Sequence, residues 1–112
     1  MAKNGSRIPG FEDEVEDKLR QAQDRVRKGQ NGVASHAKRH DLARRQLDGF
    51  KAGLQKIQGE PAPLIAERLK ALEKSAVNVA EDKQRATREL AAAEQELAEF
   101  TLARDQLKQM RG

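Results

Sequence analysis

Apolar residues recur at alternating intervals of four and three along two long stretches of this chain. One stretch precedes the segment Gly59, Glu60 and Pro61, and the other follows it. A sustained repeat of about 3.5 residues keeps one stripe of a helix facing a partner helix, which is typical of a coiled coil. Because a turn segment separates the two stretches, the nearest partner of each is the other half of the same chain. We refer to the two facing stripes as the seam.

The sequence therefore predicts an all-α fold, a long antiparallel helical hairpin of the coiled-coil type. We expect a flexible N-terminal tail over 1–9 and a single hairpin domain over 10–112, with helices at 10–58 and 62–110 and a turn at 59–61. Gly59 suits the position after a helix, and Pro61 or Pro63 suits the first turn of the next one. The large apolar residues that carry the predicted seam are Leu19, Val26, Leu47, Phe50, Leu54, Ile57, Ile65, Leu69, Leu72, Leu90, Leu97, Phe100 and Leu107.

Charges beside the seam predict how the two helices are aligned. Folding at the turn pairs seam residues whose numbers sum to 119, so that Gly29 meets Leu90. This register also brings oppositely charged residues together at flanking positions, as coiled coils often do. The three predicted pairs are Arg25 with Glu96, Arg39 with Asp82, and Lys51 with Glu73.

The weakest part of the first helix is the segment around Gly29, Asn31 and Gly32. Each glycine costs roughly 1 kcal/mol against alanine inside a helix, and Asn-Gly is a turn signal. A break at 29–34 would give three helices. The heptad spacing nevertheless continues unshifted through Gly29 to Val33 and His36. Since a loop has no reason to preserve that spacing, we favour one continuous but locally weak helix.

Composition indicates that the hairpin associates with another chain. The chain has 112 residues, of which 36% are charged and 3% aromatic. That composition suits helices that bury one stripe and hydrate the rest, and a lone hairpin buries little of each helix. The sequence thus predicts self-association, with a dimer as the simplest form, or docking to another protein. A second weak apolar strip at Ala80, Ala91 and Ala98, near Val77 and Leu102, is a candidate surface for it.

The excess of positive over negative charge lies on the first half of the chain. The net charge is +4, and residues 18–58 alone carry eleven bases and three acids. Such a surface could contact the phosphates of DNA or RNA without reading sequence. The sequence shows no cluster of aromatic side chains that could stack on the bases of single-stranded nucleic acid. It also lacks the turn residues that mark a helix-turn-helix motif. The candidate phosphate contacts are Arg20, Arg27, Lys28, Lys38, Arg44 and Arg45.

Other functional classes find little support in the sequence. His36 and His40 lie on one helix face, but no further metal ligand is expected opposite them, and a polar layer in the seam is the simpler interpretation. Cysteine is absent, and no nucleophile–base set or glycine-rich phosphate loop occurs. We therefore expect no enzyme activity, no metal, no cofactor and no small-molecule substrate. Without a signal peptide or a membrane span, a cytoplasmic location is expected.

The sequence thus predicts a non-enzymatic coiled-coil interaction module that serves as a scaffold, adaptor or small chaperone in a protein assembly. The alternative is a basic accessory protein that contacts DNA or RNA phosphates through its first helix. The identity of the protein partner is not encoded in any motif of the chain.

Overall fold

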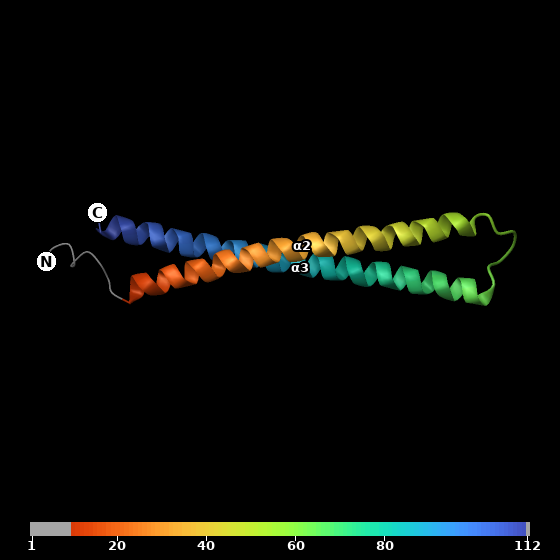
Figure 1. The fold of residues 1–112 in the computed structure, drawn as a ribbon, viewed down its shortest axis with the longest axis horizontal. Helices are drawn as coiled ribbons and strands as arrows, with labels where there is room; N and C mark the ends of the chain where they lie inside the picture. Colours follow the sequence, from red (N-terminus) through yellow and green to blue (C-terminus); the bar gives the residue numbers. More distant parts are fainter. Residues whose placement is uncertain (1–9, 112) are drawn as a thin grey trace. The chain divides into compact units, whose positions relative to one another are not determined.

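The computed structural model describes residues 10–111 and consists of two long helices, α2 (Phe11–Leu54) and α3 (Pro63–Arg111). Helix accounts for 91% of this part of the chain, which contains no strand. The two helices pack against each other with opposite chain directions (Figure 1). The predicted all-α helical hairpin is therefore confirmed. The tail predicted at 1–9 lies outside the described residues.

The contacts divide the chain into two compact units. Unit 1 joins the α2 residues up to Asn31 with the α3 residues from Arg88 onward, and unit 2 comprises Gly32–Thr87. Each unit contains one stretch of α2 and one of α3. The division falls within the segment 29–34, which the sequence indicates as the weakest part of the first helix.

The core of unit 1 is formed by residues of the predicted seam. Leu19 is 3% exposed, and Val15, Ala22, Val26 and Leu107 are also buried. A Cβ atom added to Gly29 would lie 3.1 Å from Leu90 Cδ1, so these two residues meet across the seam as the predicted register requires. In the same unit Arg25 forms an ion pair with Glu96, the first of the three predicted pairs.

The core of unit 2 is a second, separate cluster on the same heptad repeat. Ala43 and Leu47 of α2 pack with Leu72 and Ala76 of α3, and all four are buried. Partly buried apolar residues extend this cluster, namely Phe50, Leu69 and Val79. The core is thin because each helix contributes only its seam positions to it.

The other two predicted ion pairs do not form. Within the part of the chain that the structure describes, Asp82 pairs instead with Arg85, three residues further along α3, and Lys51 and Glu73 have no ion-pair partner. A pair within one helix turn needs less ordering of long side chains than a pair between helices. Local pairs therefore compete well with cross-seam pairs at exposed positions.

Helix α2 begins after a glycine cap. Gly10 has a positive φ of 82°, and its carbonyl accepts a 2.8 Å hydrogen bond from the Glu14 N–H. Glycine reaches this backbone region without the steric penalty of a side chain. Glu12, Asp13 and Glu14 occupy the first turn, where negative charge stabilises the N-terminus of a helix.

Helix α2 ends at Leu54, before the predicted end at 58. The N–H groups of Lys56 and Ile57 donate 3.1 Å bonds to the carbonyls of Gly53 and Leu54, which is the tighter pattern of a closing turn. In the predicted register Ile57 would meet Ala62, which precedes α3, so it has no partner across the seam. Ile57 is accordingly 38% exposed and lies outside the seam.

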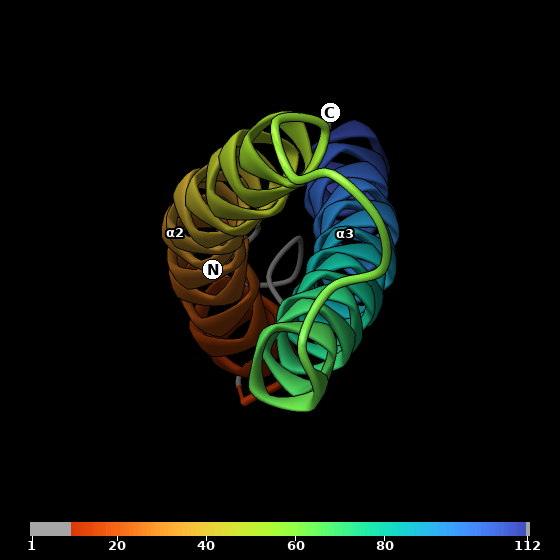
Figure 2. The same ribbon diagram turned by 90° about the vertical axis from the view of Figure 1, so that its right-hand side faces the viewer.

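The connection between the helices covers 55–62 rather than 59–61 (Figure 2). Gly59 has a φ of 88°, which favours glycine at this point of the turn. Pro63 is the first residue of α3, where its missing N–H costs nothing, as the sequence suggests. The Ala62 carbonyl accepts the first bond of this helix from Ala66.

The segment 29–34 does not interrupt α2. Neither Gly29 nor Gly32 has a positive φ, so both lie in ordinary helical geometry. The continuous helix favoured from the heptad spacing is therefore the one that forms, and the three-helix alternative is not. The glycine at 29 also allows α2 to approach Leu90 closely.

We expect Gly32→Ala to stabilise the chain by about 1 kcal/mol, because a Cβ there meets nothing within 4 Å and alanine is the better helix former. Gly29→Ala should gain less, since Leu90 must move to accept the new methyl group. Urea denaturation followed by circular dichroism measures both changes. Equal gains for the two variants would contradict the close Gly29–Leu90 contact. As a control, Gly59→Ala should cost about 1–2 kcal/mol because of its positive φ.

Leu47→Ala should destabilise the chain by about 2–3 kcal/mol, because Leu47 is 5% exposed in the unit 2 core and its truncation leaves a cavity. Leu64→Ala is the matched control on α3, where Leu64 is 77% exposed and its truncation should change stability by less than about 0.5 kcal/mol. Similar losses for both variants in urea denaturation would contradict this core.

Candidate functional site

Twelve of the thirteen large residues of the predicted seam are buried or partly buried. Leu19, Val26, Leu47, Leu72 and Leu107 are buried. Those that remain partly exposed at the edges of the seam are Phe50, Leu54, Ile65, Leu69, Leu90, Leu97 and Phe100. Ile57 is the exception described above. The buried residues among them hold the two helices of each unit together, and the flanks of each unit remain exposed.

Polar side chains interrupt the seam. His36 and His40 of α2 and Lys83 of α3 are half-buried within unit 2, and His36 Nδ1 is buried without a hydrogen-bond partner. In unit 1, Arg104 is also half-buried, with Nε 3.5 Å from Asp105 Oδ1, which is too long for a hydrogen bond. Unsatisfied polar groups weaken packing, so these positions lower the stability of the seam locally.

Unit 1 buries the carboxylate-bearing residue Glu12 near the start of α2. Glu12 is 8% exposed and lies 3.3 Å from Arg111 at the end of α3. The two residues line a hollow of about 210 Å³ with Val15, Arg104 and Leu107. The spacing contained this signal, because Glu12 and Arg111 each continue the heptad ladder by one step.

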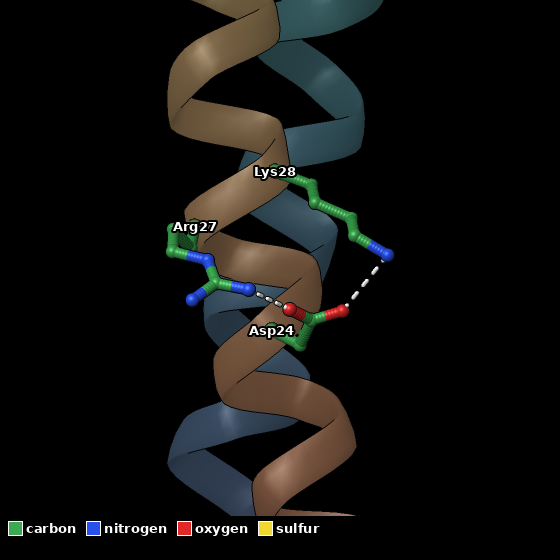
Figure 3. Close-up of polar contacts among 3 residues, drawn as sticks. All are labelled: Asp24, Arg27 and Lys28. Carbon is green, nitrogen blue, oxygen red and sulfur yellow. Dashed lines mark hydrogen bonds and ion pairs between the residues drawn. The ribbon is translucent and has the colours of Figure 1, made fainter.

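The candidate phosphate contacts Arg27 and Lys28 both bind Asp24 on their own helix (Figure 3). Lys28 Nζ lies 2.9 Å from Asp24 Oδ2, and Arg27 contacts the other carboxylate oxygen. The hydrogen bond from Lys28, supported by the charges of Lys28 and Arg27, holds the pKa of Asp24 below its ordinary value of 3.8. These two bases are therefore partly neutralised by a carboxylate one helix turn away.

The remaining candidate contacts are all exposed on α2. Arg20 pairs with Asp17, and Arg45 lies 3.1 Å from Asp41. Lys38 and Arg44 have no ion-pair partner among residues 10–111. Four of the six candidates thus bind acids of their own helix, a pattern that also suits a solvated helix surface.

A shallow groove of about 250 Å³ runs along one flank of unit 2. Its base is formed by the buried residues Leu47 and Ala76. Both helices contribute to its sides, with the residues His40, Arg44, Glu73, Val77 and Ala80. The sequence indicated Val77 and Ala80 as part of an apolar strip on α3, but not the α2 residues opposite them. The recurrence of small or charged residues every seven positions beside the seam is the signal that identifies this flank.

The described part of the chain shows neither a metal site nor a membrane-spanning helix. Over 10–111 no three His, Asp or Glu side chains converge as metal ligands, and neither helix has an apolar stretch long enough to cross a membrane. No protein-family model, curated protein or solved structure matches the chain.

The lowered pKa of Asp24 predicts an acid-dependent contribution to stability. Its paired carboxylate stabilises the helix above pH 3.8, and this contribution disappears as the pH falls below that value and the group protonates. Asp24→Asn should therefore be less stable than the wild type near neutral pH, and the two should converge in acid. Urea denaturation at several pH values measures the difference. Asp48→Asn is the control, and an equal pH dependence in that variant would contradict the role of Asp24.

Proposed function

We propose that this chain is a non-enzymatic helical-hairpin interaction module that self-associates, or docks into a larger protein assembly, as a scaffold, adaptor or small chaperone. The observation that carries the proposal is the amount of surface the chain leaves exposed. The chain exposes 8508 Å². A compact monomer of its mass, 12.5 kDa, exposes about 6,200 Å².

The undescribed terminal residues do not account for this difference of about 2,300 Å². An unfolded chain of that length exposes about 1,500 Å². The remaining several hundred Å² are comparable with the roughly 800 Å² that each partner buries in a typical stable interface. A further protein surface would supply the burial that one narrow seam leaves out.

The exposed apolar residues also support an interaction role. Phe11, Leu42, Leu64, Val77 and Leu102 are each about half exposed or more. Single exposed apolar residues are ordinary on protein surfaces, but here they accompany cores made only of seam residues. The expected absence of enzyme activity and the expected cytoplasmic location remain predictions.

Binding of DNA or RNA phosphates by α2 is the second candidate function. Lys38 and Arg44 are the bases that favour it, since both are exposed and have no acidic partner in the described chain. The in-helix pairs of Arg20, Arg27, Lys28 and Arg45 count against it, because a bound phosphate would have to displace their carboxylates. We therefore rank it below the protein-interaction role.

We expect sedimentation equilibrium to show a dimer at micromolar concentration, with a melting temperature that rises with protein concentration. The association should change far less between low and physiological salt than phosphate binding does, because it neutralises no row of phosphates. A strictly monomeric protein at hundreds of micromolar would contradict self-association. Tight binding to a double-stranded DNA or RNA that weakens steeply with salt would favour the second candidate.

A further inference from the structure

The groove of unit 2 carries opposite charges on its two sides. Arg44 stands on the α2 side and Glu73 on the α3 side, and both are exposed. Neither residue has an ion-pair partner among residues 10–111, although each lines the same groove. One positive and one negative group are thus presented side by side with their charges available to another surface.

Three of the four flanking neighbours of these charges are alanines. Along α2 the flanking positions at seven-residue intervals are Ala37, Arg44 and Lys51, and along α3 they are Ala66, Glu73 and Ala80. The three alanines are half-buried beside the seam. Alanine at such positions lets another helix approach closely, because no long side chain fills the space between the backbones. The apolar base of the groove, Leu47 and Ala76, would then lose its remaining contact with water.

We propose that this groove is the docking site for a second copy of the chain, related by a two-fold axis parallel to the helices. That operation places α2 of each copy over α3 of the other, in antiparallel directions. Arg44 of one copy then meets Glu73 of the other, and the same contact occurs twice by symmetry. The inference rests on the proposed self-association and names the surface that carries it.

The arrangement of charges favours a second copy as the occupant. A two-fold interface is self-complementary, and a surface with one positive and one negative group at matching positions satisfies this requirement with itself. The arrangement resembles the packing of an up-and-down four-helix bundle, in which neighbouring helices are antiparallel. Val77, 56% exposed at the side of the groove, would become covered.

Charge reversal tests the contact directly. Arg44→Glu and Glu73→Arg should each weaken the dimer by about tenfold or more in sedimentation equilibrium, because each places like charges together twice. The double variant, Arg44→Glu with Glu73→Arg, restores opposite charges and should return the Kd to within about threefold of the wild type. Arg45→Glu is the control on the same helix, because Arg45 pairs with Asp41 and does not line the groove, and it should leave the Kd unchanged.

A second pair of variants tests the apolar part of the groove. Val77 and Leu102 lie on α3 and are exposed to nearly the same extent, 56% and 57%, but Leu102 does not line the groove. Val77→Asp should weaken the dimer by about tenfold or more, and Leu102→Asp should not. Circular dichroism on all variants verifies that the helices are retained.

The outcomes separate the groove from self-association in general. A wild-type dimer whose Kd is unchanged by Arg44→Glu, Glu73→Arg and Val77→Asp would overturn the groove as the interface and leave self-association intact. Failure of the double variant to recover, while its helicity is normal, would overturn the Arg44–Glu73 contact. A wild-type chain that stays monomeric at hundreds of micromolar would overturn both this inference and the proposed self-association.

Discussion

Burial of one apolar stripe holds the two helices together, and that stripe is narrow. In unit 1 it consists of Val15, Leu19, Ala22, Val26 and Leu107, and in unit 2 of two residues from each helix. The hydrophobic contribution to the free energy of unfolding scales with the apolar area removed from water. A hairpin that buries only one narrow stripe therefore has a small free energy of unfolding. Small defects in the seam therefore matter more here than in a thick globular core.

The polar and glycine positions near the middle of α2 are such defects. Gly29 and Gly32 lower the helix propensity, and His36 and His40 place imidazoles where apolar side chains would pack better. The helix nevertheless continues through them, because a helix already formed on both sides adds each residue cheaply. Gly29 is also the residue that permits close approach to Leu90, so the same position weakens the helix and tightens the seam.

The charges on the flanks have a different role from the seam. Most of the observed ion pairs join residues three or four apart on one helix, such as Arg20 with Asp17 and Arg45 with Asp41. Exposed pairs of this kind contribute little to stability. Charged side chains that take part in none of these ion pairs, such as Arg44 and Glu73, are available to a partner. The flank of unit 2 that carries them is therefore the surface on which we base the docking proposal.

The sequence by itself determined the helices, the stripe that they bury and the register in which Gly29 meets Leu90, because heptad spacing is written in the order of residues along each helix. Only the tertiary structure decided three further features. Helix α2 stops at Leu54 and Ile57 has no partner in α3, Glu12 is buried beside Arg111, and side chains from both helices form the groove. These three features depend on where the second helix begins and ends and on which flank the two helices share. No single stretch of sequence specifies how two distant stretches come together.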